Sequence, residues 1–172
     1  MRKNIIILTF VLILAGVAMF QSGKASNQEQ LPKIGFQAPG FQLSDLNGES
    51  YFFDNIRGNK PVVVNFWASW CNPCRIEAPE LVKLYKEYGE EIEILAVNLT
   101  EGDSAEAAAE FAEEYGFTFP VLLDKEGTVS DLFQTRAVPT TYFINKDGTI
   151  QDIVIGLASP SDLQSKFRQL LP

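Results

Sequence analysis

Two cysteines carry the chemistry that this sequence offers most plainly. Cys71 and Cys74 form a Cys-x-x-Cys pair that follows a valine-rich run at 62–66 and precedes a segment of helical periodicity. This order places Cys71 at a helix N-terminus, where unpaired backbone N–H groups stabilise a thiolate. We therefore expect Cys71 to attack a disulfide and Cys74, one helical turn later, to resolve the mixed disulfide. No cofactor is expected beyond this redox-active pair.

Two structural interpretations of the cysteine pair stay open as alternatives. A zinc site needs about four ligands, and the chain has two cysteines and no histidine, so zinc would require a partner chain. A purely structural disulfide more often joins distant segments. Arg75 stands where covalent haem attachment needs histidine, and the lack of histidine excludes Ser-His-Asp hydrolysis and histidine-ligated metal catalysis. We expect no metal.

Length and charge limit the organisation and the partners of the chain. With 172 residues, 46% of them hydrophobic, the chain can bury the core of one globular domain. Its formal net charge of -8 disfavours nucleic acid and anionic membrane surfaces as partners. We expect a monomer that binds no nucleic acid.

The N-terminal residues predict the compartment. Arg2 and Lys3 precede an apolar stretch at 5–20, the pattern of an export signal. Bulky Met19 and Phe20 extend the stretch and favour its retention as a single-pass membrane anchor. Small residues further on leave cleavage and secretion as the alternative. In both cases the domain faces the oxidising, extracytoplasmic side of the membrane.

Three regions are therefore expected along the chain: a signal or membrane anchor at 1–25, a polar tether at 26–33, and one domain at 34–172. Within the domain, turn signals and hydrophobic periodicity predict the elements that would position the cysteines. In order, these are strands at 41–43 and 50–52, a short helix at 53–57, a strand at 61–66, a helix after Cys71, a strand at 91–98, a helix around 108–115, a strand at 119–123, a short helix at 127–133, a hairpin at 140–155, and a last helix capped by Ser159. This order predicts an α/β fold, with a central mixed β-sheet flanked by helices on both faces and an N-terminal β-hairpin extension.

That order resembles the thioredoxin fold, because a Trp-Cys-x-Pro-Cys motif ending at Cys74 follows the first core strand and Val138-Pro139-Thr140 precedes the last hairpin. More narrowly, residues 34–172 resemble the membrane-tethered, extracytoplasmic thiol-disulfide oxidoreductases of cytochrome c maturation, the ResA/TlpA type of the AhpC/TSA-like thioredoxin superfamily. Further segments that carry the resemblance are Gly40-Phe41, 64–71, Ala96-Val97-Asn98 and Phe119-Pro120-Val121.

The resemblance implies a substrate-binding surface beside the cysteines. Pro139 is expected to be cis and to lie against the disulfide, although only about 5–6% of X-Pro bonds in folded proteins are cis. The backbone of Val138 is expected to pair with an extended substrate. Trp70, next to the first cysteine, is expected to form part of an apolar ledge for a polypeptide.

Two acidic residues match positions at which ResA-like proteins carry acids close to the dithiol. Glu77 lies three residues after Cys74, on the same side of the helix, and Glu101 follows a strand end at the carboxyl edge of the sheet. Such carboxylates would raise a thiol pKa and accept its proton. A solvated surface glutamate is the alternative for each. The chain departs from related patterns at Asn65, where cytoplasmic thioredoxins have aspartate, and at Asn72, where ResA-like proteins often have glutamate.

The resemblance implies a reductase of disulfides in exported proteins. Apocytochrome c before haem ligation is the implied substrate, and a membrane thiol donor of the CcdA type would regenerate the dithiol. Three alternatives stay open: an extracytoplasmic oxidase or isomerase, a reductase for another exported protein such as one of the spore envelope, and a non-catalytic module that binds polypeptides.

Overall fold

The computed structural model describes residues 32–171. A β-sheet that is covered on both faces forms the centre of this part of the chain. The strands are β1 (Gln42–Asp45), β2 (Ser50–Phe52), β3 (Val62–Trp67), β4 (Glu93–Asn98), β5 (Val121–Leu123), β6 (Thr140–Ile144) and β7 (Ile150–Ile155). The helices are α2 (Phe53–Ile56), α3 (Asn72–Tyr88), α4 (Ala105–Tyr115), α5 (Thr128–Leu132) and α6 (Pro160–Leu170), with a 3-10 turn, η1, at Thr100–Gly102. The expected anchor at 1–25 and most of the expected tether lie outside the described residues.

All seven strands form one mixed sheet in the order β2-β1-β5-β4-β3-β6-β7. The β3–β4 and β4–β5 pairs are parallel, and the other pairs are antiparallel. The N-terminal hairpin continues the sheet, because β1 pairs with β5 through the register Ser44↔Leu123. The predicted mixed sheet is confirmed, and the predicted hairpin extension is its edge.

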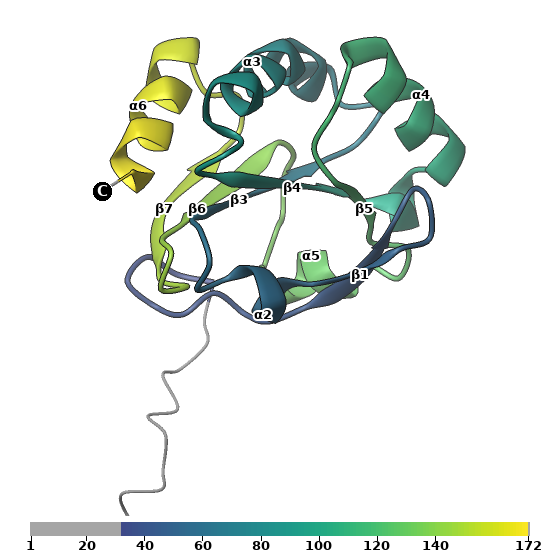
Figure 1. Ribbon diagram of the computed structural model, residues 1–172. Helices are drawn as coiled ribbons and strands as arrows, with labels where there is room; N and C mark the ends of the chain where they lie inside the picture. Colours follow the sequence, from purple (N-terminus) through teal and green to yellow (C-terminus); the bar gives the residue numbers. More distant parts are fainter. Residues whose placement is uncertain (1–31, 172) are drawn as a thin grey trace, which may run out of the picture.

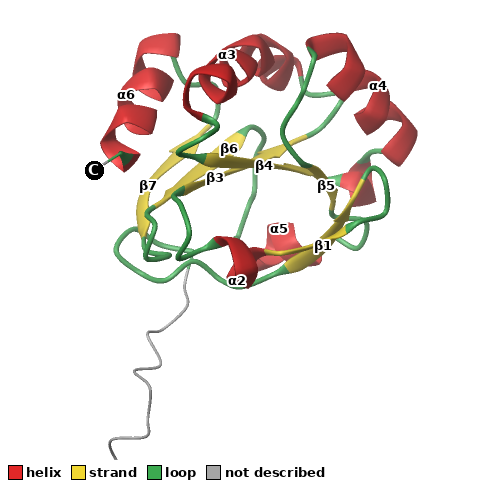
Figure 2. Cartoon of the chain, in the orientation of Figure 1, coloured by secondary structure: helices red, strands yellow, loops and turns green. Residues whose placement is uncertain are grey.

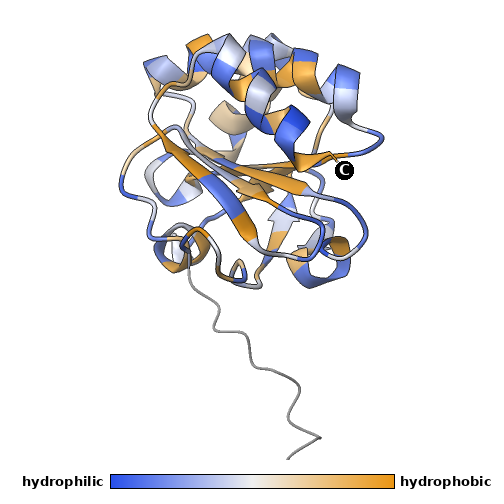
Figure 3. Cartoon of the chain, turned by 90° about the vertical axis from the view of Figure 1, so that its left-hand side faces the viewer, coloured by the Kyte–Doolittle hydropathy of each residue, from blue (hydrophilic) through white to orange (hydrophobic). Residues whose placement is uncertain are grey.

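Alternate side chains of β3 supply two separate cores. Val63 and Trp67 belong to the core under α3, α4 and α6, whereas Val64 and Phe66 belong to the core with α2 and α5. Figure 1 shows these two groups of helices on opposite faces of the sheet. A strand buried on both faces needs apolar residues at nearly every position, and every residue of β3 is buried. Figure 2 shows helices on both sides of the sheet, and Figure 3 shows its apolar central strands. The predicted helices on both faces are thus confirmed.

The central strand β3 sends the chain out at the carboxyl edge of the sheet, where the cysteine pair follows. At this edge β4 ends and β6 begins, since Trp67 of β3 pairs with Asn98 of β4 and Phe66 pairs with Thr140 of β6. This edge of the sheet therefore brings together the cysteine turn, η1 and the segment before β6.

None of the helices within residues 32–171 is both long enough and apolar enough to span a membrane.

Candidate redox site

Cys71 and Cys74 form a disulfide at the start of α3. Cys71 is the N-cap residue in an extended conformation, and the backbone N–H of Cys74 donates to Cys71 Sγ at 3.1 Å. Pro73 fits the first turn, because an amide there would have no partner within the helix. The sulfur of Cys71 therefore lies where the helix dipole and an amide favour a negative charge.

The disulfide is nearly covered, since each cysteine is only 3% exposed. Three apolar side chains nearby in sequence or fold are open to solvent: Trp70, next to Cys71, is 61% exposed, Ile76 on α3 is 60% exposed and Leu157 is half-exposed. Ile76 and Leu157 also line a cavity of about 340 Å³ beside Glu77, between α3 and the start of α6. The exposed indole of Trp70 therefore offers an apolar surface directly beside Cys71.

Glu77 is a buried acid on α3, one helical turn after Cys74. Its Oε2 accepts a hydrogen bond from Asn65 Nδ2 at 3.1 Å, and its Oε1 accepts the backbone N–H of Ala158 at 3.5 Å. Asn65 Nδ2 also donates to Thr141 Oγ1 at 2.9 Å. Burial raises the pKa of Glu77 to about 7, although the hydrogen bonds from Ala158 and Asn65 act in the opposite direction. A carboxyl with this pKa can both accept and release a proton near neutral pH.

Glu101 lies on η1 and is exposed. Its carboxylate covers Gly127, the N-cap residue of α5, so closely that a Cβ built on Gly127 would come within 2.1 Å of Glu101 Oε2. Its backbone N–H donates to the carbonyl of Asp124. The contacts of Glu101 are thus with the start of α5, and its role beside the dithiol stays a prediction.

The Val138–Pro139 peptide bond is cis. The carbonyl of Pro139 accepts the backbone N–H of Gly156 at 2.7 Å, and Thr140 Oγ1 donates to the carbonyl of Ala137 at 2.8 Å. Val138 packs against the core cluster that contains both cysteines. The structure therefore places Val138 next to the apolar surroundings of the disulfide, as expected for a residue of the binding surface, although its contact with substrate stays a prediction.

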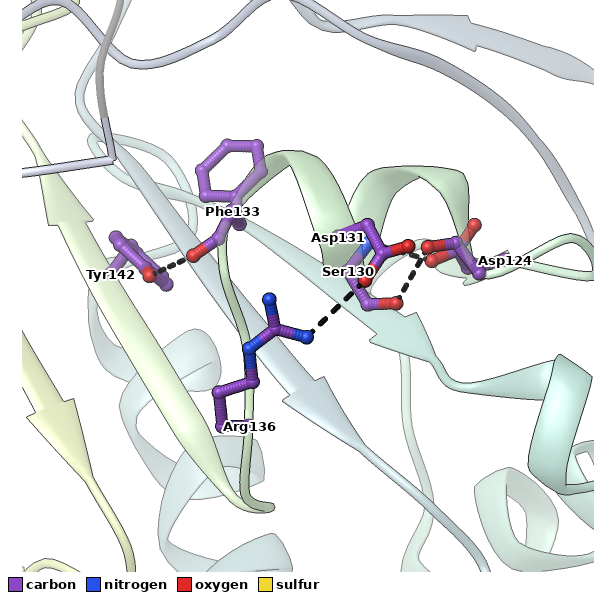
Figure 4. A network of polar contacts seen from close by, with 7 residues as sticks. Asp124, Ser130, Asp131, Phe133, Arg136 and Tyr142 are labelled. Carbon is purple, nitrogen blue, oxygen red and sulfur yellow. Dashed lines mark hydrogen bonds and ion pairs between the residues drawn. The ribbon is translucent and has the colours of Figure 1, made fainter.

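A polar network holds the segment that leads into Pro139 (Figure 4). Asp124, which is fully buried, accepts the backbone N–H groups of Val129 and Ser130 at 3.2 and 2.7 Å and so fixes the start of α5. After α5, the hydroxyl of Tyr142 donates to the carbonyl of Phe133. Both ends of the short helix are therefore attached to the sheet, which fixes where the chain enters the cis-proline loop.

Asp103 is a site residue that the sequence interpretation missed. Its carboxylate accepts the backbone N–H and the hydroxyl of Ser69, both at 2.6 Å, two residues before Cys71. Asn98 Nδ2 donates to the same carboxylate at 2.9 Å. Burial alone would raise the pKa of Asp103, but hydrogen bonds, chiefly those from Ser69, hold it below its ordinary value. No motif distinguishes this aspartate from the many other acids of the chain.

Comparison with known proteins agrees with this geometry. The model of the AhpC/TSA family matches residues 34–153. The chain is 41% identical to the thioredoxin-like protein YneN of Bacillus subtilis, over 77% of this chain and 78% of that protein. It is 37% identical to the thiol-disulfide oxidoreductase ResA of Geobacillus kaustophilus, over 81% and 79% of the two chains. The crystal structure of StoA from Bacillus subtilis superimposes with a TM-score of 0.64 at 25% identity, covering 74% of this chain and 96% of that one.

A thioredoxin-like fold with a disulfide at the N-terminus of its central helix defines a thiol-disulfide oxidoreductase. The chain belongs to the AhpC/TSA family and is similar to the ResA proteins within it.

Proposed function

We propose that this oxidoreductase reduces disulfides in exported proteins, and that its substrate is apocytochrome c before haem ligation. The observation that carries the proposal is the buried carboxyl of Glu77, with a pKa of about 7, one helical turn after Cys74. A carboxyl near a dithiol destabilises the thiolates by charge repulsion and can take up a thiol proton. The charge repulsion favours a dithiol that gives its electrons away, and the proton uptake speeds the attack by the second thiol.

In the first step, the thiolate of Cys71 attacks one sulfur of the substrate disulfide. A bond forms between Cys71 Sγ and that sulfur, the substrate S–S bond breaks, and the other substrate sulfur leaves as a thiolate. The helix N-terminus and the N–H of Cys74 stabilise the attacking thiolate. The exposed indole of Trp70 and the backbone of Val138 would hold the polypeptide on either side of its cysteine.

In the second step, the thiol of Cys74 loses its proton to the carboxylate of Glu77 and attacks Cys71 Sγ. The mixed disulfide breaks, the second substrate sulfur leaves as a thiolate, and the Cys71–Cys74 disulfide forms. The substrate has gained two electrons, and the protein has lost them. Asn65 supports Glu77 in this step, because its hydrogen bond stabilises the charged carboxylate that must accept the proton.

The oxidised protein needs an electron donor to act again. A membrane thiol donor of the CcdA type would supply two electrons and two protons to the disulfide. The apolar stretch at 5–20, preceded by Arg2 and Lys3, supports a membrane-anchored protein that stays near such a donor. Glu101 would add a second acidic group to the outer rim of the site.

The reduction potential of the Cys71–Cys74 pair tests the direction of electron flow. The purified full-length protein in detergent is equilibrated with dithiothreitol and with glutathione buffers. A potential near or below about -230 mV supports a reductant, whereas a value above about -180 mV overturns the proposal in favour of an oxidase or isomerase.

A deletion strain tests the substrate. Loss of covalent cytochrome c, restored by the wild-type protein but not by Cys71→Ser, supports apocytochrome c. Normal cytochrome c with a defect in another exported protein would assign a different substrate to the same reductase.

A further inference from the structure

The turn that carries the nucleophile is held by groups from outside it. Ser69 lies two residues before Cys71, and each of its polar groups has a partner. Its backbone N–H donates to Asp103 Oδ2 and its hydroxyl donates to Asp103 Oδ1, both at 2.6 Å, while its carbonyl accepts Arg75 Nη2 at 2.8 Å. The turn is thus fixed from the β4–α4 connection and from α3 together.

The partners of Ser69 are themselves anchored. Asp103 Oδ2 also accepts Asn98 Nδ2 at 2.9 Å, and Asn98 is fully buried at the end of β4. The guanidinium of Arg75 lies 5.4 Å from the centre of the Phe111 ring on α4. The position of Ser69 is therefore tied to the sheet and to a second helix.

The next residue is attached to the same connection. Trp70 Nε1 donates to the carbonyl of Gly102 at 2.9 Å, so two consecutive residues, Ser69 and Trp70, are bound to the consecutive residues Gly102 and Asp103. This pairing orients the exposed indole of Trp70, whereas the backbone before Cys71 is held through Ser69.

We propose that Asp103 is a positioning residue of the redox site. It holds the Ser69–Trp70 turn in a single conformation, in which Cys71 Sγ and the Trp70 indole both face a partner disulfide. The effect is geometric and does not depend on the charge of Asp103. The proposal rests on the dithiol chemistry of the proposed function and holds for either direction of electron flow.

The hydrogen-bond pattern allows geometry and charge to be separated. Oδ2 of Asp103 accepts two N–H donors, whereas Oδ1 accepts a hydroxyl, and a hydroxyl can also act as an acceptor. In Asp103→Asn, the amide oxygen can replace Oδ2 and the amide nitrogen can donate to a reversed Ser69 hydroxyl. This variant removes the negative charge and keeps all three hydrogen bonds, whereas Asp103→Ala removes the charge and the hydrogen bonds together.

The test measures attack by Cys71 on dithiodipyridine, a neutral aromatic disulfide, by the reduced full-length protein in detergent across a range of pH. The thiolate of Cys71 displaces one thiopyridone, and Cys74 then displaces the second. We expect Asp103→Ala to slow the pH-independent rate about tenfold and Asp103→Asn to stay within about twofold of wild type. The matched control is Glu106→Ala, an exposed acid on the first turn of α4, which should leave the rate unchanged.

Two outcomes overturn the proposal. One is a folded Asp103→Ala protein that reacts as fast as wild type, and the other is an Asp103→Asn protein as slow as Asp103→Ala, which would assign the effect to charge. If Asp103→Ala fails to fold, Ser69→Ala replaces it, since it removes one hydrogen bond only. We expect that variant to slow about twofold to threefold, and an unchanged rate overturns the proposal. A high reduction potential of the wild-type protein would contradict the proposed direction of electron flow. It would not change the expected rates of the variants relative to wild type.

Discussion

Asn65 on β3 donates to the buried carboxyl of Glu77 on α3, with 3.1 Å between Asn65 Nδ2 and Glu77 Oε2. The amide is 2% exposed and the glutamate 3% exposed, so the hydrogen bond replaces water at a carboxyl that the fold has buried. An amide at this strand position cannot itself exchange protons, and the titrating group is on the helix instead. The helix therefore supplies the acid, and the strand lowers the pKa of that acid against the larger effect of burial.

Removing the Asn65 donor should raise the pKa of Glu77 above about 7, because the hydrogen bond favours the charged form. We expect Asn65→Ala to shift the titration of the Glu77 carboxyl to higher pH, as measured by carbon NMR on the oxidised protein. Thr141→Val is the control, since it removes the other acceptor of Asn65 Nδ2 and leaves the donor to Glu77 in place. An unchanged titration in Asn65→Ala would show that burial and the Ala158 hydrogen bond determine this pKa without Asn65.

The raised pKa of Glu77 also predicts how stability depends on pH. The folded protein holds this proton up to about pH 7, whereas an unburied glutamate releases it near 4.5. The folded state therefore binds more protons in this interval, and the free energy of unfolding should fall as the pH rises through it, by on the order of 3 kcal/mol.

Urea unfolding of wild type and Glu77→Gln at pH 5 and pH 8 measures this effect. The variant has no charge to bury, so we expect it to lose less stability than wild type between the two pH values. Equal losses of unfolding free energy in the two proteins would exclude Glu77 as the source of the pH dependence.

Local signals predicted the helix start that carries the cysteines, because the strand end, the N-cap and the first-turn proline are close in sequence. The strand ending at Trp67, Cys71 at the N-cap and Pro73 in the first turn all lie within one short stretch. The burial of Glu77 could not be read in the same way. Its surroundings come from Asn65 and Ala158, which approach only when the sheet and α6 are assembled.

The two acids of the β4–α4 connection show a second limit of sequence interpretation. Glu101 and Asp103 are separated by one residue, and the sequence favoured Glu101 because of a resemblance. The 3-10 turn at Thr100–Gly102 was not predicted, and it sends the two side chains to different partners, Glu101 to Gly127 and Asp103 to Ser69. A short turn of this kind is decided by tertiary contacts, so spacing alone could not choose between the two residues.

Gly127 should tolerate a side chain poorly for two reasons. Its φ is +67°, in the left-handed region, and a Cβ would collide with Glu101 Oε2. We expect Gly127→Ala to lower the free energy of unfolding by more than the about 1–2 kcal/mol that the backbone conformation alone costs.

Gly116→Ala is the matched control, because Gly116 has a φ of +71° and no heavy atom within 4 Å of a built Cβ. Chemical denaturation should show a larger loss for Gly127→Ala than for Gly116→Ala. Adding Glu101→Ala to Gly127→Ala should remove the additional loss of unfolding free energy, because the colliding carboxylate is then absent. Equal losses at the two glycines would mean that the Glu101 side chain moves aside without cost.

Trp70 should matter for polypeptide substrates and not for small ones. Its indole is 61% exposed and held by Gly102, so truncation removes an apolar contact surface with little effect on the core. In a Cys74→Ser background, which cannot resolve the mixed disulfide, we expect Trp70→Ala to slow capture of a disulfide-containing polypeptide about tenfold. Capture of dithiodipyridine should change much less.

Phe52→Ala, which removes an exposed aromatic ring from the edge strand β2, serves as the control for lost surface hydrophobicity. Equal slowing with both substrates would place Trp70 in the positioning of Cys71 and would remove it from the polypeptide-binding surface.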